Sequence, residues 1–384
     1  MTAFVPDDLP PRGITAESLA SLMPEILGAE RAVARLDGLS RGFSSPWLVA
    51  RPLMRREAET SSRIEDTIAT AEEVALYEAG YGAARNETVE VANYLVALQH
   101  GLSSDLPISR RLICEMHRLL LREVRGENNR PGEIRASQNR IGGTEGDART
   151  ARFVPPPPGQ GLEDSLAAFE RFVNAPPAVF PPIVAIALAH YQFEAIHPFG
   201  DGNGRVGRAL AALSLCRSGL LQYPLVYLSG YFDRHRQSYY DLLLHVSTRG
   251  DWNSWLRFFL AAVSSQARDA GERIIRLRDL YDVQRTKLQR GRGASLSLAL
   301  LDHLYGSPAV TAASAQRALD TTDPTARKAI KRLEESGLLK EHTGREYGKV
   351  WVARPILDII NAVFETEENS EQFDRDGRES EGQT

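Results

Sequence analysis

Residues 197–208 read His-Pro-Phe-Gly-Asp-Gly-Asn-Gly-Arg-Val-Gly-Arg, and this stretch decides the local fold around a site. The preceding residues 183–196 are rich in Ala, Leu and Ile with no breaker inside, which predicts a buried helix. Pro198 should end that helix near His197, because the residue before a proline is pushed out of the α region. The glycines predict a tight loop, and a second helix should run from Arg205 onward. The free N–H groups at the start of that second helix would form an anion site.

The side chains of the same stretch suit phosphate and metal chemistry. His197 can be neutral near pH 7 and accept a proton from an attacking hydroxyl. Asp201 is a hard oxygen ligand suited to Mg²⁺, and the Asn203 amide can donate to a phosphate oxygen. Arg205 and Arg208 offer forked donors and lie three residues apart, on the same side of the predicted helix. A structural segment has little use for this mixture.

The stretch matches the signature His-Pro-Phe-x-Asp-Gly-Asn-Gly-Arg-x-x-Arg at every specified position, so the chain resembles the Fic family. Residues 130–135 (Arg-Pro-Gly-Glu-Ile-Arg) and 138–142 (Gln-Asn-Arg-Ile-Gly) look like the family's flap hairpin, which positions the target segment. Residues 36–39 and 52–58 look like its N-terminal helical extension. The resemblance implies a helical core and AMPylation, the transfer of AMP from ATP to a protein Ser, Thr or Tyr hydroxyl with release of pyrophosphate.

The resemblance also implies a role for each residue, with ATP and Mg²⁺ as the ligands. These roles are general base for His197, loop anchor for Phe199, Mg²⁺ ligand for Asp201, anion hole for Gly202, Asn203 and Gly204, β-phosphate contact for Arg205, γ-phosphate contact for Arg208, and flap or target positioning for Ile134, Arg135, Asn139 and Ile141. The physical logic is that preorganised donors and a metal ion stabilise the charge that builds as the α-phosphorus is attacked.

A second motif, Ser61-Ser-Arg-Ile-Glu65, resembles the inhibitory-helix motif of Fic proteins. On a helix its spacing puts Ser61 and Glu65 on one face. The resemblance implies that Glu65 pairs with Arg208 and takes this arginine away from the γ-phosphate. The match departs at Asp66, where the family prefers Gly or Asn, and this leaves the strength of inhibition open. The inhibitory helix is expected near residues 61–76.

Three functions follow from these motifs. The first is an autoinhibited AMPylase whose targets include itself. The second is a deAMPylase or bifunctional enzyme, because in some Fic proteins the same glutamate positions a water that removes AMP; here this would be Glu65. The third is a DNA-binding regulator in which the Fic core senses a nucleotide. The intact His197, Asp201 and Arg208 favour an enzyme.

Composition sets the remaining bounds. The chain has 384 residues and a formal net charge of −4, which argues against a protein dedicated to coating nucleic acid or anionic membrane. Its two cysteines, Cys114 and Cys216, lie in apolar helical patterns. We expect buried free thiols, no cysteine zinc site and a reducing, cytoplasmic location. No apolar run reaches membrane-spanning length, and the first residues do not resemble an export signal.

The predicted fold is mainly α, a Fic helical core with a short β-hairpin flap and a C-terminal winged helix-turn-helix. The expected divisions are an N-terminal helical region over 1–100, the catalytic core over 101–260, a helical linker over 261–293, a winged helix over 294–357 and a disordered acidic tail over 365–384. Amphipathic helices are expected over 14–36, 61–76, 87–100, 109–121, 162–174 and 234–246, and one or two long charged helices over 261–290.

The predicted third helix of the C-terminal unit, over residues 323–336, carries Arg327, Lys328, Lys331 and Arg332, the charge that a recognition helix needs. Acidic residues flank it, and winged helices also dock proteins. A docking or scaffolding role is therefore preferred over DNA binding, and a homodimer could form. His190 lies seven residues before His197; we expect a packed histidine there rather than a metal ligand.

Overall fold

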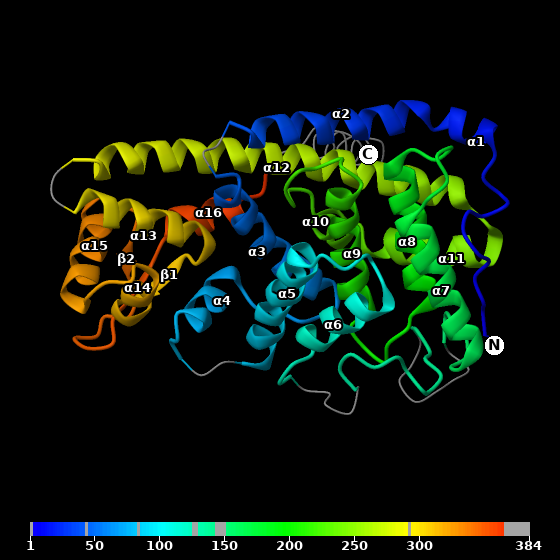
Figure 1. The fold of residues 1–384 in the computed structure, drawn as a ribbon, viewed down its shortest axis with the longest axis horizontal. Coiled ribbons are helices and arrows are strands. Elements are labelled where there is room, and N and C mark those ends of the chain that lie inside the picture. The colour runs from blue at the N-terminus through cyan, green and yellow to red at the C-terminus, as the bar shows by residue number, and fades with distance from the viewer. Residues whose placement is uncertain are drawn as a thin grey trace, which may run out of the picture.

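The computed structural model describes residues 3–42, 45–82, 85–124, 130–142, 151–290 and 293–364. Helices dominate, and the only sheet of the described residues is small (Figure 1). The elements are α1 (Ala16–Ser21), α2 (Met23–Ser40), α3 (Trp47–Ile64), α4 (Ala71–Glu78), α5 (Asn86–Ser103), α6 (Arg110–Leu120), α7 (Gln160–Asn174), α8 (Pro182–Ile196), α9 (Asn203–Arg217), α10 (Ser229–Arg234), α11 (Arg236–Arg249), α12 (Trp252–Leu288), α13 (Ala294–Gly306), β1 (Ala309–Thr311), α14 (Ala312–Ala318), α15 (Asp323–Glu335), β2 (Lys340–Glu341), β3 (Val350–Val352) and α16 (Arg354–Asn361). The mainly α fold class is confirmed.

Two long helices run side by side along the molecule (Figure 1). Helix α12 is one continuous helix of 37 residues, begun by the Asp251 side chain, which accepts a hydrogen bond from the Ser254 N–H. It packs on α2 over most of the length of that helix, and it also contacts α8, α13 and α16. The helix predicted to begin at residue 261 therefore starts earlier, and it is packed against both halves of the molecule.

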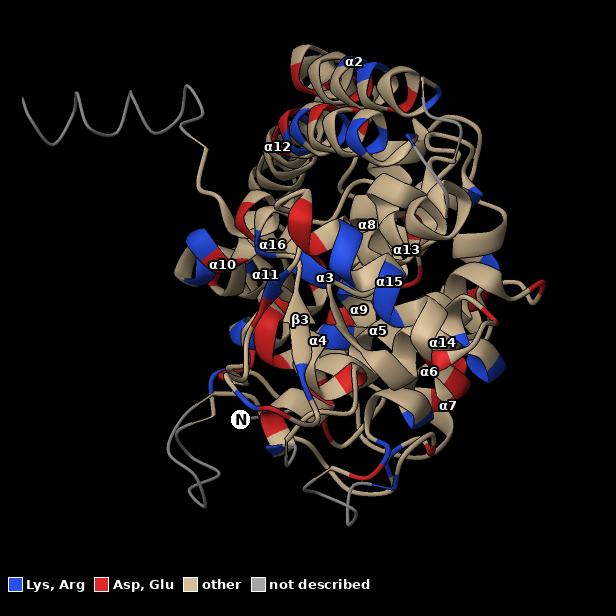
Figure 2. Cartoon of the chain, turned by 90° about the vertical axis from the view of Figure 1, so that its left-hand side faces the viewer, with Lys and Arg blue, Asp and Glu red and all other residues tan. Residues whose placement is uncertain are grey.

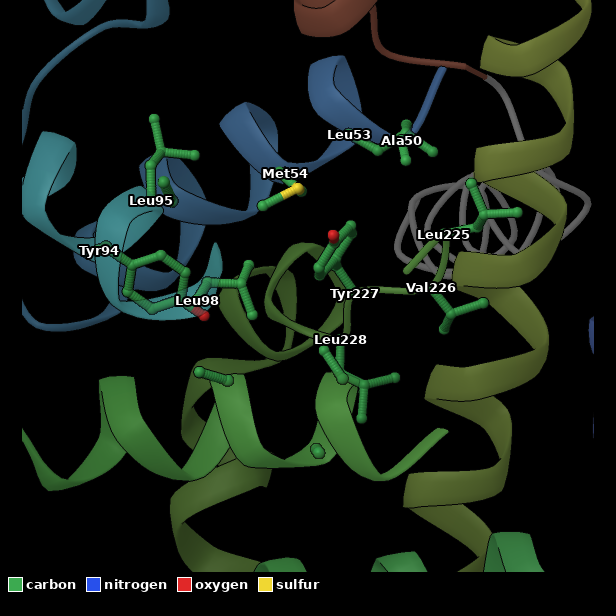
Figure 3. Packing of buried hydrophobic residues seen from close by; sticks show 14 of the residues in the cluster. Ala50, Leu53, Met54, Tyr94, Leu95, Leu98, Leu225, Val226, Tyr227 and Leu228 are labelled. Atoms are coloured by element: carbon green, nitrogen blue, oxygen red, sulfur yellow. The ribbon is translucent and has the colours of Figure 1, made fainter. Parts of the chain in front are cut away.

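The hydrophobic core continues between these helices and the shorter ones. Figure 3 shows one part of it, where Leu53 and Met54 of α3 face Leu98 of α5 and the segment 225–228. All of these apolar side chains are buried. Helix α3, which ends in the Ser61–Glu65 motif, is thus held by core packing along its length.

The helix predicted before the signature loop is confirmed as α8. Nearly every residue of α8 is buried, which explains its apolar composition on all sides. It ends at His197, whose φ of 50° lies in the left-handed region and cannot continue the helix. Gly202, with φ of 75°, precedes α9, which begins at Asn203. The predicted order of helix, tight loop and helix is therefore present.

Two predicted helices are wrong as single elements. The helix over 14–36 is two helices, α1 and α2, divided at Leu22, because Pro24 has no N–H to continue a helical ladder. The helix over 61–76 does not exist either, since α3 ends at Ile64 and Asp66 has φ of 60°. A new capping box between Thr70 and Glu73 then starts α4.

The C-terminal unit has the helix order that the sequence predicts, with additions. Strand β1 follows α13, and strands β2 and β3 follow α14 and α15. The three strands form an antiparallel sheet in the order β1-β3-β2, in which Val310 lies opposite Trp351 and Lys340 opposite Val352. Thr311 caps the start of α14 through a capping box with Ser314. Strand β1 and helix α16 were not predicted. This arrangement is consistent with a winged helix-turn-helix.

The flap is less regular than the predicted hairpin. Among its described residues, the only pairing is one antiparallel bridge between Ile141 and Phe153. The predicted acidic tail over 365–384 lies outside the described residues. No helix within the described ranges is both long and apolar enough to cross a bilayer.

Candidate active site

The signature loop is braced by its own amide side chain. Asn203 accepts a hydrogen bond from the Phe199 N–H at 2.8 Å through Oδ1, and donates to the Phe199 carbonyl at 2.9 Å through Nδ2. The side chain is buried, and both ends of its amide are used. One N–H of this amide is therefore committed to the loop, and donation by the amide to a phosphate stays a prediction. The backbone N–H groups at the start of α9 remain as the phosphate donors.

A histidine that sequence reasoning passed over holds the same loop from the other side. His117 of α6 accepts a hydrogen bond from the Gly132 N–H at 2.8 Å through Nδ1, and its Nε2 lies 3.0 Å from the Asp201 carbonyl. Its ring stacks on Phe199, with centroids 3.7 Å apart and planes 4° apart. Because Nδ1 accepts, the proton must be on Nε2, and burial lowers the pKa of His117 to about 4. The ring is therefore neutral at pH 7.

Two of the four predicted flap residues, Arg135 and Asn139, form hydrogen bonds with the signature loop. Arg135 donates to the His197 carbonyl at 2.8 Å through Nε, and its backbone N–H donates to the Pro198 carbonyl at 2.9 Å. Asn139 donates to the Phe199 carbonyl at 2.7 Å. Ile134 is half-buried against the core, and Ile141 forms the bridge to Phe153. The flap and the loop are thus one hydrogen-bonded assembly.

His197 sits at the end of α8 with an imidazole poised to accept a proton. Burial lowers the pKa of His197 to about 4, although the nearby Glu65 and Asp201 carboxylates oppose this shift. Its buried Nδ1 has no side-chain or backbone partner within hydrogen-bond distance among the described residues. A neutral imidazole at pH 7 is the form that can act as a base.

The start of α9 carries the charges expected for a phosphate site. Arg205 is buried and pairs with Glu90 of α5 at 3.0 Å, a partner that the sequence did not indicate. Its second nitrogen lies 3.5 Å from Asp201 Oδ2. The Asp201 side chain is 49% exposed and accepts one hydrogen bond, from the Gly202 N–H. One accessible carboxylate beside a phosphate site fits Mg²⁺, which takes few protein ligands and completes its shell with phosphate oxygens and water.

Arg208 is held by the Ser61–Glu65 motif, as the resemblance implied. Nε donates to Ser61 Oγ at 2.9 Å, and Nη2 donates to the Ser61 carbonyl and to Glu65 Oε1, both at 2.8 Å. The Arg208 side chain is only 1% exposed, whereas that of Glu65 is 34% exposed. Ser61 contributes from the last turn of α3, and Glu65 from the residue that ends it. The two meet Arg208 although they do not share an uninterrupted helix.

Asp66, the departure from the family motif, has a partner of its own. Its carboxylate accepts two hydrogen bonds from Arg236, at 2.9 and 3.0 Å. Arg236 is the first residue of α11, so the pair connects the end of the inhibitory motif to a helix that lines the pocket. These hydrogen bonds lower the pKa of Asp66.

Two further acids near Arg208 were missed by sequence reasoning. Glu57 of α3 is buried and accepts from Tyr94 Oη and Ser229 Oγ, and burial raises its pKa to about 7. Glu194 of α8 has a buried Oε1 without a hydrogen-bond partner among the described residues, and burial likewise raises its pKa to about 7. Neither residue stands in a motif, so only the tertiary structure brings them to the site.

Some of these groups line one pocket of about 500 Å³, whereas Asp201 and Arg205 are not among its lining residues. His197, Gly204, Arg208, Glu65 and Glu194 line one part of it. Other lining residues come from the flap and from α11, and they include Ile141, Phe153, Tyr240, Leu243 and Leu244. Polar groups suited to phosphates thus share a cavity with an apolar wall, which is the composition of a nucleotide site.

His190 is a packed histidine, as expected. It lies 3.0 Å from Tyr239 Oη and 3.2 Å from the Gly207 carbonyl, and it stacks among aromatic rings. Within the described residues, no group of three or more His, Cys, Asp or Glu side chains is placed to hold a metal ion.

Comparison with known proteins agrees with this geometry. Residues 23–103 match the family model for the Fic/DOC family N-terminal region, and residues 107–215 match the model for the Fic/DOC family. The protein adenylyltransferase Fic of Aedes aegypti is 38% identical over 152 residues, which are 39% of this chain and 27% of that protein. Its counterpart in Drosophila melanogaster is 32% identical over 174 residues, 45% of this chain and 32% of that protein. The chain spans less than a third of the length of these relatives.

Solved structures share the architecture. A Fic family protein from Desulfovibrio desulfuricans G20 superposes with a TM-score of 0.57 over 90% of this chain and 98% of that chain, at 23% identity. Fic-1 from C. elegans, residues 134–508, superposes with a TM-score of 0.52 over 69% of this chain and 76% of that chain, at 25% identity. The signature loop and the flap therefore lie on a fold in which residues 23–103 and 107–215 each match a Fic/DOC family model.

Proposed function

We propose that this chain is an autoinhibited protein adenylyltransferase, which moves AMP from ATP to a hydroxyl side chain of a protein, itself included. The observation that carries the proposal is the pairing of Arg208 with Glu65 at 2.8 Å in the pocket that His197 also lines. One cavity is thus lined by the predicted base His197, by Gly204 and Arg208 of the predicted phosphate site, and by the predicted inhibitory residue Glu65. The names of the curated relatives support the same activity.

In this mechanism, neutral His197 takes the proton of the target hydroxyl as its oxygen attacks the α-phosphorus. A phosphorus–oxygen bond to the target forms, the bond to the β-phosphate bridging oxygen breaks, and pyrophosphate leaves. The N–H groups at the start of α9 and the guanidinium of Arg205 face the phosphates and offset the charge that develops. Asp201 would hold Mg²⁺, which supplies additional charge neutralisation when bound.

The pairing of Arg208 sets the resting state. A guanidinium that is already bound to Ser61 and Glu65 has fewer N–H groups to offer a γ-phosphate. Nucleotide that enters the pocket then lacks one of its clamps and lies in a pose that does not suit attack. Removing the Glu65 carboxylate would return Arg208 to the nucleotide.

Incubation with α-labelled ATP and Mg²⁺ tests the proposal. We expect weak self-labelling by the unmodified chain, stronger self-labelling by Glu65→Gly, and none by Glu65→Gly combined with His197→Ala. A Glu65→Gly chain that labels no more than the unmodified chain would refute the autoinhibition. Absence of label on the chain and on every protein of a cell lysate would refute the transferase. A labelled lysate would also identify the target.

Removal of AMP is a second candidate because of where Glu65 lies. Its side chain is 34% exposed and lines the same pocket as His197, so water can reach both groups. An AMP-modified target mixed with the unmodified chain should then lose its label, and Glu65→Gln should stop that loss. If Glu65→Gln removes AMP as fast as the unmodified chain, this second activity is excluded.

The C-terminal unit is better suited to docking protein than DNA. In Figure 2, the ribbon at this end of the molecule carries basic and acidic residues close together. On α15, Arg327 pairs with Asp323 at 2.7 Å and Lys331 lies 3.8 Å from Glu335, so half of its basic residues are already neutralised. Salt-sensitive binding of duplex DNA that responds to ATP would instead support the regulator hypothesis.

A further inference from the structure

A second cavity lies away from the candidate active site, at the junction of α3, α5 and α13. It has a volume of about 420 Å³, and we call it the junction pocket. Trp47, Arg51, Arg55, Leu102, His303 and Gly306 are among the residues that line it. None of its lining residues is shared with the pocket that contains His197.

Arg55, which lines the junction pocket, has one unused hydrogen-bond donor. Nε and Nη2 of Arg55 donate to the Gly306 carbonyl at 2.9 and 2.7 Å, where they satisfy the end of α13, and Nη2 also pairs with Glu78. The Arg55 side chain is only 4% exposed. Its Nη1 is buried and has no hydrogen-bond partner among the described residues. A buried cationic N–H without an acceptor is costly, so an acceptor from outside the chain is expected there.

Arg51 lies one turn earlier on the same face of α3 and is also uncommitted. It is exposed and forms no hydrogen bond or ion pair with the described residues. A Cβ on Gly306 would lie 2.9 Å from Arg51 Cδ, so the arginine rests directly against this glycine. Glu78, the one carboxylate of the pocket, is already taken by Arg55.

The charge of the pocket is therefore positive. His303 also lines the pocket and can be titrated. Its pKa is lowered first by burial and then by the charges of Arg51 and Arg55. A site with two arginines and one carboxylate favours an anion.

The remaining wall of the junction pocket is apolar. Trp47 is 40% exposed and makes a T-shaped contact with Tyr223, with ring centroids 5.7 Å apart. Leu95, Leu102 and Met54 line the pocket beside it. An aromatic face and aliphatic side chains next to free guanidinium groups fit a ligand with a charged head and an apolar body.

We propose that the junction pocket binds a small organic anion, a phosphate monoester or carboxylate attached to an aromatic or aliphatic group. The head would lie between Arg51 and Nη1 of Arg55, and the body would lie against Trp47 and Leu102. Such a ligand would connect α3 to α13, and so the core to the C-terminal unit. The inference does not depend on the activity proposed above.

Isothermal titration of the full chain with phenyl phosphate and with benzoate tests the site. We expect one of these probes to bind with a stoichiometry of one, and inorganic phosphate to bind more weakly because it has no apolar body. Arg51→Ala should weaken the binding about tenfold or more, since it removes a charged hydrogen-bond donor. The matched control Arg35→Ala removes an exposed arginine of α2 and should leave the binding unchanged.

Arg51 makes no contact that the fold needs, so Arg51→Ala should unfold at the same temperature as the unmodified chain. Trp47→Phe keeps an apolar ring and should weaken the probe less than Trp47→Ala. Equal affinity in the unmodified chain and in Arg51→Ala would place the probe elsewhere, for example at the start of α9, and would overturn the inference. Failure of both probes to bind would overturn it as well, and neither result would bear on AMP transfer.

Discussion

Oxygen Oε1 of Glu65 occupies the space where a side chain at residue 204 would begin: a Cβ on Gly204 would lie 2.3 Å from it. The same Cβ would lie 2.8 Å from Nη1 of Arg208. Gly204 belongs to the signature loop and Glu65 to a motif far from it in sequence, yet the glycine is what lets the carboxylate reach Arg208. The signature loop and the Ser61–Glu65 motif therefore fit each other sterically.

This relationship predicts the effect of Gly204→Ala. The new methyl group cannot coexist with the Glu65–Arg208 pair, so the buried guanidinium loses its partner. We expect the free energy of unfolding to fall by about 1–2 kcal/mol, because Glu65 is part-exposed and water compensates in part. Chemical denaturation measures the change.

Two controls make the Gly204→Ala result specific. In a Glu65→Gly background the same substitution should cost less, since only the flexible end of Arg208 then meets the methyl group. Gly38→Ala, in α2 with no atom near the added Cβ, should be neutral or stabilising. Equal losses from Gly204→Ala in both backgrounds would show that Glu65 does not occupy this space.

Asp66→Asn should relax the inhibition slightly. Asparagine tolerates the left-handed backbone at this position but removes the ion pair to Arg236. Both partners are exposed, so the pair contributes about 0–1 kcal/mol and self-labelling should rise by at most about fivefold. High salt should raise self-labelling of the unmodified chain and have little effect on Asp66→Asn. Self-labelling of Asp66→Asn equal to that of the unmodified chain at low salt would argue against this role.

His117→Phe should disturb the signature loop without removing any residue that is proposed to take part in AMP transfer. Phenylalanine can keep the stacking on Phe199, but it loses the hydrogen bonds to Gly132 and Asp201. Leaving the Gly132 N–H and the Asp201 carbonyl unpaired should cost about 1–3 kcal/mol of stability. AMP transfer by a Glu65→Gly background should fall as the flap and loop separate. His100→Phe on the surface of α5 serves as the matched histidine control, and an equal effect there would count against His117.

The acid limb of activity should lie well below the ordinary histidine range. Because the pKa of folded His197 is about 4, its neutral form persists down to mildly acidic pH and is lost as pH falls through 4. Protonation removes the base, so the transfer rate of Glu65→Gly should decline in that window. Nucleotide affinity measured at the same pH values separates binding from proton transfer. A midpoint near 6.5 would mean that His197 is not desolvated in the reacting complex.

Stability should follow the same titration. The pKa of His197 is lower in the folded chain than in the unfolded chain. The free energy of unfolding is therefore highest above the unfolded pKa, where His197 is neutral in both states. This contribution to stability is lost as pH falls from about 6.5 through about 4. His117 has the same sign and adds to the loss. The variant His197→Gln should therefore lose less stability than the unmodified chain between pH 7 and pH 4.

The sequence predicted those features that depend on contacts between residues close together in the chain. Pro198 and the glycines fixed the end of α8 and the start of α9, because these are local backbone effects. Thr311 as the N-cap of α14 and Pro324 in the first turn of α15 act locally in the same way. The contact of Glu65 with Arg208 was expected from family resemblance, not from spacing. The helix predicted over residues 61–76 was wrong, because no pattern in the sequence indicates the left-handed backbone of Asp66.

The sequence by itself determined the chemistry available at the signature loop and the points where the local backbone must turn. Only the tertiary structure decided which groups meet there: His117 under Phe199, Glu90 on Arg205, and Asp66 on Arg236. It also showed that the Asn203 amide forms hydrogen bonds with the backbone of Phe199 in its own loop. The physical reason is that backbone preference acts over a few residues, whereas burial and ion pairing join residues more than eighty positions apart, which no local pattern encodes.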